Sequence, residues 1–325
     1  MKFGILDQSP IEIGGSSSDA LKQSVHLAKT AESLGYERFW VSEHHGSEQL
    51  AGTSPEVLMS YLLAHTNTIR VGSGGVMLQH YSPYKVAENF NVLDALAPGR
   101  VDVGVGKAPG GLPITTQALQ IEQQEEKKQS FDKKLSLLHQ YFDERSSLRA
   151  EPYRSTPPPV YVLGASVESA QLAARTGSSF VFAGFINQSR ELLKAAVNAY
   201  RELSKTGLVI LALPIYVGES DEEATAETND LWHYRVIFDD GSKVTVTSRE
   251  QAELFGSQEK RPFRIEADKL PIIAGSALTV QQTLEEITSD VGIDELIFHT
   301  PIRNFRKRIR SYEQLSRLFE KEEVE

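Results

Sequence analysis

Apolar strand-like segments alternate with helix-like segments along the entire chain, and this alternation limits the possible folds more than any other feature of the sequence. The helix-like segments carry apolar residues three or four positions apart, and several of them end at glycine. Strands separated by helices are typical of parallel sheets covered by helices. Segments with strand character lie at 3–6, 39–41, 69–77, 101–105, 160–163, 179–183, 208–217 and 295–299.

Eight strands in 325 residues, with no linker between them, predict one α/β domain over 1–325. The count and the alternation favour a (β/α)8 barrel, the TIM barrel, over an open doubly wound sheet with the same periodicity. The alternation of strands and helices is interrupted at about 233–270, where two strand-like segments, 236–238 and 244–246, flank a turn sequence. We therefore expect an insertion with a small hairpin before the last part of the barrel, acting as a mobile lid. The last helix is expected at about 312–319.

Charge and composition exclude several classes of protein. The net charge is -10 and there is no basic stripe, which argues against nucleic-acid binding. The chain has no cysteine, so disulfides, thiolate zinc sites and a cysteine nucleophile are excluded. No apolar run reaches membrane-spanning length, and charge comes too early at the N-terminus for a signal peptide. We expect a cytoplasmic protein without membrane or nucleic-acid partners.

The second strand ends in ionisable residues, within the stretch Arg-Phe-Trp-Val-Ser-Glu-His-His-Gly at 38–46. In a parallel barrel the C-terminal ends of the strands share one mouth, where ligands bind. His44 and His45 are successive, so their side chains diverge and only one points into the mouth, whereas Glu43 should face away. The groups expected around this mouth are Asp7, His44, Gly74, Gly75, Lys107, Ser166, Phe185 and His299.

Two further features predict a ligand at this mouth. Lys107 follows the fourth strand, and Ser166 opens the helix after the fifth, so a cation lies near free helix N–H groups that favour phosphate. The glycines at 72, 74 and 75 predict a bulge or a strained peptide within the third strand. Gly104 and Gly106 leave room for either a flat ligand or a neighbouring backbone.

Several motifs together resemble the bacterial-luciferase-like flavin monooxygenases, and the resemblance covers essentially the whole chain. Two of these motifs, at 7–10 and 106–110, resemble the single-chain branch of that family. The strongest matches are Trp-Val-Ser-Glu-His-His at 40–45, Arg-Val-Gly-Ser-Gly-Gly-Val-Met-Leu at 70–78, Glu-Asn-Phe-Asn-Val-Leu-Asp at 88–94, Pro-Gly-Arg-Val-Asp at 98–102 and Val-Tyr-Val-Leu-Gly-Ala-Ser at 160–166.

The resemblance implies a (β/α)8 barrel that binds FMN, or reduced FMN as a co-substrate, at the mouth. His44 matches the family's catalytic histidine, and Gly74 and Gly75 match a non-proline cis peptide beneath the isoalloxazine ring. The residues that match the phosphate site are Lys107, where the family has arginine, Ala165, where luciferase has an acid, Ser166 and Ser169. No metal ligands are implied.

The activity implied by the resemblance is monooxygenation of a small organic substrate, such as an aldehyde, with O2. No nicotinamide site is visible, so a separate flavin reductase would supply the reduced FMN. Relatives also imply a homodimer, formed through the helices at about 55–66 and 83–96. These helices carry the apolar residues Val57, Leu58, Tyr61, Leu62, Val86, Phe90 and Leu93.

Three other readings remain open from the sequence. A deazaflavin (F420)-dependent oxidoreductase shares the same barrel, and a non-catalytic flavin-binding protein would share it without turnover. A metal-dependent barrel hydrolase would use His44, His80, His299 and Asp7, although the usual His-x-His or His-Glu-x-x-His spacing is absent.

Overall fold

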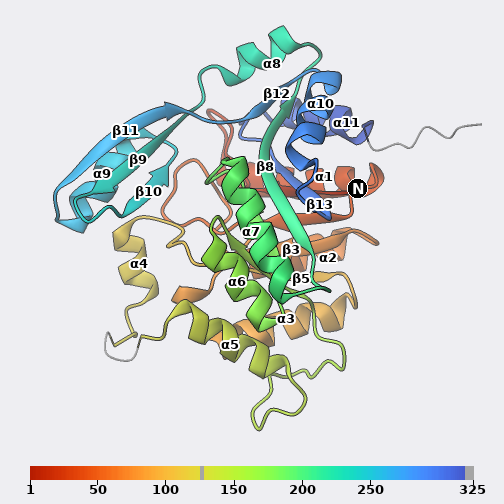
Figure 1. Ribbon diagram of the computed structural model, residues 1–325, viewed down its shortest axis with the longest axis vertical. Coiled ribbons are helices and arrows are strands. Elements are labelled where there is room, and N and C mark those ends of the chain that lie inside the picture. Colours follow the sequence, from red (N-terminus) through yellow and green to blue (C-terminus); the bar gives the residue numbers. More distant parts are fainter. Residues whose placement is uncertain (125–127, 319–325) are drawn as a thin grey trace, which may run out of the picture.

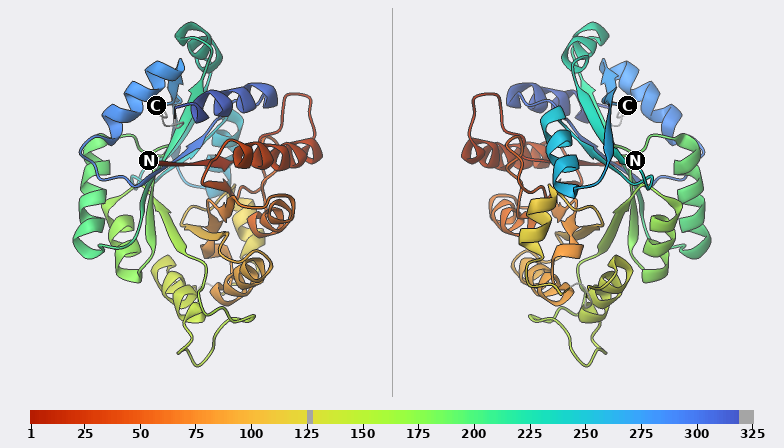
Figure 2. Two further views of the ribbon diagram at one scale, coloured as in Figure 1. Left: turned by 90° about the vertical axis from the view of Figure 1, so that its right-hand side faces the viewer. Right: turned by 90° about the vertical axis from the view of Figure 1, so that its left-hand side faces the viewer.

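Eight parallel strands close into a barrel, and helices surround it (Figures 1 and 2). The computed structural model describes residues 1–124 and 128–318. Each strand pairs with the next, and the last pairs with the first, which confirms the TIM barrel. In order around the barrel the strands are β1 (Lys2–Asp7), β2 (Arg38–Val41), β3 (Arg70–Ser73) extended by β4 (Val76–Met77), β5 (Val101–Gly106), β6 (Val160–Gly164), β7 (Ser179–Ala183), β8 (Val209–Val217) and β13 (Glu295–His299).

The helices begin where the sequence offers a capping side chain. Ser16, Ser166 and Ser189, for example, each accept a hydrogen bond from the backbone N–H three residues on, which satisfies one free donor of the helix start. The helices outside the insertion are α1 (Ser17–Ser33), α2 (Pro55–His65), the 3₁₀ turn η1 (Leu78–His80), α3 (Pro83–Leu96), α4 (Pro113–Leu119), α5 (Phe131–Phe142), α6 (Val167–Thr176), α7 (Arg190–Leu203), α8 (Asp221–Thr228), α10 (Ala277–Thr288) and α11 (Phe305–Ser316).

The last helix was placed wrongly from the sequence. It begins at Phe305 after Asn304, whose side-chain oxygen accepts from the N–H of Lys307, and it ends at Ser316. The expected end at Phe319 lies outside the described residues. Asparagine at a helix start is an ordinary cap, so this signal was present in the sequence. No helix within 1–124 and 128–318 is long and apolar enough to cross a membrane.

The segment that interrupts the alternation folds into its own small sheet, beside α4 in Figure 1. Strands β9 (Trp232–Phe238) and β10 (Lys243–Val246) form the expected hairpin. Strand β11 (Phe263–Lys269) pairs with the other edge of β9, and α9 (Arg249–Glu259) packs on one face. These two elements were not foreseen. The chain then rejoins the barrel through β12 (Ile273–Gly275), which pairs with β8.

Side chains fill the barrel interior in layers, because alternate residues of a strand point inward. Along β2 and its extension the inward residues are Arg38, Trp40 and Ser42, and along β13 they are Glu295, Ile297 and His299. The middle layer is apolar and contains Trp40 and Ile297 with their neighbours. The other face of each strand packs against the helices as the main core.

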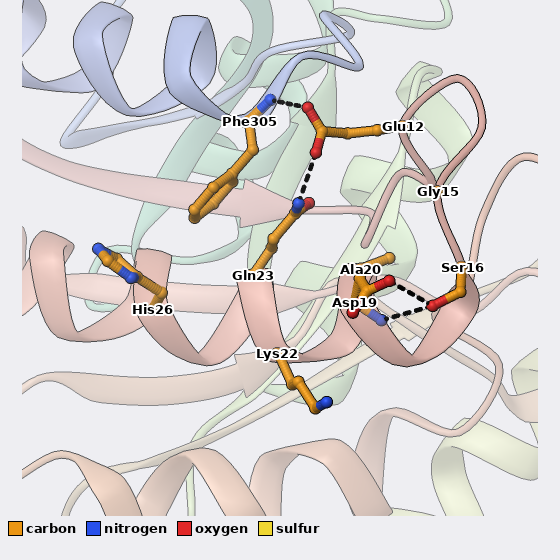
Figure 3. Close-up of a pocket in the computed structure, with 9 residues that line it drawn as sticks. All are labelled: Glu12, Gly15, Ser16, Asp19, Ala20, Lys22, Gln23, His26 and Phe305. Carbon is orange, nitrogen blue, oxygen red and sulfur yellow. Dashed lines mark hydrogen bonds between the residues drawn. The ribbon is translucent and has the colours of Figure 1, made fainter.

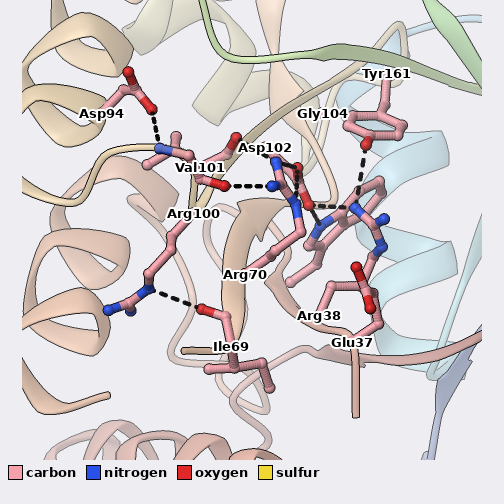
Figure 4. A network of polar contacts seen from close by, with 12 residues as sticks. Glu37, Arg38, Ile69, Arg70, Asp94, Arg100, Val101, Asp102, Gly104 and Tyr161 are labelled. Carbon is pink, nitrogen blue, oxygen red and sulfur yellow. Dashed lines mark hydrogen bonds and ion pairs between the residues drawn. The ribbon is translucent and has the colours of Figure 1, made fainter. Parts of the chain in front are cut away.

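The layer at the N-terminal end of the strands is charged, and we call it the floor (Figure 4). The Arg38 guanidinium donates to Glu295 Oε2 at 2.8 Å and to Asp102 Oδ2 at 2.5 Å. Asp102 also accepts from Trp40 Nε1 at 2.9 Å and from Arg70 Nε at 3.0 Å. Arg38, Asp102 and Glu295 are all buried, so each charge depends on its partners.

Candidate active site

His44 follows β2 at the mouth of the barrel and is held by the inward-facing Ser42. The Ser42 Oγ lies 3.0 Å from His44 Nδ1, which fixes the orientation of the ring. Burial lowers the pKa of His44 to about 4, against the opposing effect of the Glu43 carboxylate. With this pKa the His44 ring is neutral at pH 7.

A second imidazole, His299, lies at the end of β13 near the first. Its side chain is only 7% exposed, and its ring packs edge-on against Phe185 with ring centroids 5.5 Å apart. Burial, and then the neighbourhood of His44, lower the pKa of His299 to about 4. Within the described residues its Nδ1 is buried and has no hydrogen-bond partner. The sequence placed His299 at the mouth but gave it no role outside a metal site.

Glu43 and His45 face away from the mouth, and Glu43 forms hydrogen bonds with the segment around β4. Glu43 is fully buried, and its Oε1 accepts from the Tyr81 hydroxyl at 2.6 Å and lies 2.7 Å from His45 Nε2. Its Oε2 accepts from the backbone N–H of Met77 at 2.9 Å. These contacts tie β4 to the end of β2, so His45 is a packing residue, and His44 takes no part in them.

The peptide between Gly74 and Gly75 is cis, as the resemblance implied. The glycines around it allow two strands to approach closely. A Cβ added to Gly104 would lie 1.9 Å from the carbonyl oxygen of Ser73, and the Ser73 hydroxyl bonds both the N–H and the carbonyl of Gly104. A neighbouring backbone therefore explains Gly104, whereas the ligand contacts of Gly74 and Gly75 stay a prediction.

Lys107 lies next to the N-terminus of α6, because strands β5 and β6 pair up to Gly106 and Leu163. Its side chain is exposed and, in the described part of the chain, has no hydrogen-bond or ion-pair partner. The Ser166 Oγ accepts from the N–H of Ser169 at 3.2 Å, and the two hydroxyl oxygens are 3.2 Å apart. A free cation beside a helix start is a combination that suits an anionic group.

Asp7 was expected at the mouth, and this was wrong. Its neighbour Leu6 faces the interior, so Asp7 points outward, where Arg308 Nη1 donates at 3.0 Å and Ser24 Oγ at 2.5 Å. Both ring nitrogens of His80 are also occupied, with Pro109 O at 2.7 Å and the Gln120 amide at 2.9 Å. The described residues contain no group of three acidic or histidine side chains that could hold a metal, so the hydrolase reading is not supported.

A shallow cleft of about 380 Å³ lies near Asp7, between the loop before α1, α1 itself and the start of α11 (Figure 3). Its polar side chains bond to one another. Glu12 accepts from Gln23 at 2.8 Å and from the N–H of Phe305 at 2.9 Å, and Ser16 donates to Asp19. These contacts join α1 to the loop before it and to the start of α11, so the polar groups of this cleft are used within the protein.

The fold and the mouth define a (β/α)8-barrel protein that carries two imidazoles, a cis peptide and an exposed lysine at the C-terminal ends of its strands. The sequence profile of the family described as luciferase-like monooxygenase matches residues 1–315, and the chain belongs to this family. It is 43% identical to the N-acetyl-S-alkylcysteine monooxygenase of Bacillus subtilis over 97% of each chain. The family establishes a monooxygenase or related oxidoreductase as the class of enzyme.

Two solved structures share the fold over nearly the whole chain. The crystal structure of apo-MsnO8 is 31% identical and has a TM-score of 0.79 over 98% of each chain. The oxygenating constituent of 3,6-diketocamphane monooxygenase from a Pseudomonas putida plasmid, solved in complex with FMN, has a TM-score of 0.71. That protein is 16% identical to this chain and covers 97% of it, with 96% of its own length matched, so it shows the fold alone.

Proposed function

We propose that the protein is a flavin-dependent monooxygenase that uses reduced FMN and O2 on a small organic substrate. The observation that carries this proposal is His44, a neutral imidazole held by Ser42 at the mouth of a luciferase-like barrel. A separate reductase would supply the reduced FMN. The reaction balances when one oxygen atom enters the substrate and the other leaves as water, while reduced FMN becomes FMN.

The residues at the mouth fit FMN. Lys107 and the N-terminus of α6, with Ala165, Ser166 and Ser169, would hold the phosphate, and Gly74 and Gly75 would lie against the ring. Reduced FMN, when bound, would supply the two electrons that the reaction with O2 requires. The chain's own part is to orient the substrate, to exclude water and to move a proton at His44.

The first substrates to test are N-acetyl-S-alkylcysteines, because the relative with 43% identity is named for them. The assay supplies the protein with FMN, a flavin reductase and N-acetyl-S-methylcysteine under ¹⁸O2. We expect a product that carries one labelled oxygen atom. No labelled product from thioethers or aldehydes would contradict the monooxygenase, and turnover with deazaflavin alone would identify the F420-dependent alternative.

Replacing Lys107 with alanine is expected to weaken FMN binding clearly, and more so at low ionic strength. The exposed ammonium group loses its attraction for the phosphate, and salt screens that attraction over a Debye length of about 10 Å at 0.1 M. Flavin titration at two salt concentrations measures the effect, with Lys133→Ala on α5 as an exposed control. Unchanged affinity in Lys107→Ala would remove this residue from the phosphate site.

We also propose that the protein forms a homodimer through α2 and α3. Of the apolar residues expected there, Leu62, Val86, Phe90 and Leu93 pack inside their own subunit. The large apolar residues that remain exposed on these helices are Val57, Tyr61, Val92 and Leu96. Light scattering at micromolar concentration should give twice the monomer mass, and Tyr61→Glu should lower it. A monomer mass for the unchanged protein would refute the dimer.

A further inference from the structure

His299 has the features of a ligand-binding residue that lacks its ligand. Its side chain is more than nine-tenths buried, yet its Nδ1 has no partner among the described residues. Buried polar atoms in folded proteins nearly always find a hydrogen bond, so an unpartnered one calls for an explanation. His80 shows the contrast, because both of its ring nitrogens are bonded within the protein.

The position of His299 follows from the register of β13. Glu295, Ile297 and His299 share the inward face, where Glu295 belongs to the floor and Ile297 to the apolar middle layer. The third residue of this series therefore points into the mouth. There it packs against the Phe185 ring and lies near His44.

The strand order places His299 opposite the proposed phosphate site. From β13 the path to β5 runs through β1, β2 and β3 in one direction and through β8, β7 and β6 in the other, so the two strands are four steps apart either way. A flavin whose phosphate is anchored at Lys107 and α6 would therefore reach into the mouth from the side opposite His299. The half of the mouth around His44, Phe185 and His299 is then left for the second reactant.

We propose that His299 is a substrate-binding residue, which donates a hydrogen bond to an oxygen atom of the organic substrate held between His299 and His44. A neutral imidazole has one N–H to donate, and the adjoining Phe185 ring offers an apolar surface for an alkyl group. N-acetyl-S-alkylcysteines carry both kinds of group, an amide or carboxylate oxygen and an S-alkyl chain. This inference rests on the proposed function.

The test compares three variants of the FMN-loaded protein, with N-acetyl-S-methylcysteine as the probe. His299→Phe keeps a ring without nitrogen, His299→Asn places an amide near Nδ1, and His299→Gln places one near Nε2. We expect His299→Phe to weaken probe binding about tenfold or more, with FMN affinity unchanged. One of the two amide variants should recover most of the loss and so identify the nitrogen that binds.

Urea unfolding of the FMN-free variants separates binding from structure. His299→Phe removes a buried nitrogen that has no partner, so its unfolding midpoint should be unchanged or higher. The inference is overturned if His299→Phe binds the probe normally, if FMN affinity falls with probe affinity, or if neither amide variant recovers any of the loss. If His299→Phe does not fold, the other two variants still test the inference. It is then overturned if His299→Asn and His299→Gln both bind the probe as tightly as the unchanged protein does.

The same experiment distinguishes this inference from the proposed function. If the unchanged protein binds the probe but forms no oxygenated product, the monooxygenase proposal fails, while the variants still decide whether His299 binds the probe. If the unchanged protein does not bind the probe, the role given to His299 is wrong, whatever other substrate it oxygenates.

Discussion

Replacing His44 with alanine is expected to lower substrate oxygenation by a factor of about 100 or more, the usual loss when an acid–base group is removed. The side chain reaches the mouth and its only bond within the described residues is to Ser42, so folding and FMN binding should be largely preserved. Single-turnover oxidation of protein loaded with pre-reduced FMN, followed by product analysis, measures the effect.

The matched control is His45→Gln, which retains a hydrogen-bond donor for the buried Glu43 and should cost much less activity. The pH dependence gives a second check. Because burial lowers the pKa of His44 to about 4, the neutral ring persists from pH 8 to about pH 5, and the rate should fall as pH drops toward 4. An inactive His45→Gln, or an active His44→Ala, would contradict the assignment.

Replacing Arg38 with methionine is expected to lower the free energy of unfolding by about 3–5 kcal/mol. The guanidinium is buried in the floor, and its loss leaves Asp102 and Glu295 buried with one cationic partner fewer between them. Arg70 still pairs with Asp102, so Glu295 loses most. Urea unfolding of purified protein measures the change, with the exposed pair of Arg145 and Asp143 as the comparison.

Arg145→Ala should give no measurable change, because exposed ion pairs contribute little. If Arg38→Met does not fold, Arg38→Lys can be tested in its place. Lysine keeps the positive charge but loses the forked geometry, so the free energy of unfolding of Arg38→Lys should be lower than that of the unchanged protein, by less than about 3–5 kcal/mol. An Arg38→Met protein as stable as the unchanged protein would show that the floor does not depend on this ion pair.

The barrel could be predicted from the sequence because each signal that indicates a strand or a helix is local. Short apolar runs placed the strands, and Ser166 marked the start of a helix correctly. The same local reasoning required His44 and His45 to face opposite ways, and the family resemblance selected His44 as the one at the mouth. Strand parity could also have found Ser42, because it continues the series of inward residues that begins with Arg38 in the floor.

Apart from the last helix, whose local cap at Asn304 was overlooked, the errors concern contacts between residues far apart in the chain. Asp7 follows an inward residue, but its orientation is secured by Arg308, which lies 301 positions later. Strand β11 pairs with β9 across α9, and no local pattern specifies that partner. His80 became a structural residue through Pro109 and Gln120, on loops whose course only the folded chain defines.

The separation of the charged floor from the mouth has a consequence for how such a chain diversifies. The ion pairs of Arg38, Asp102 and Glu295 lie at one end of short strands, and the two imidazoles lie at the other. A substitution at the mouth that admits a bulkier compound leaves those ion pairs intact, so new specificities arise without loss of the framework. Laboratory evolution of this barrel should therefore randomise residues beside His44 and His299 and leave the opposite end unchanged.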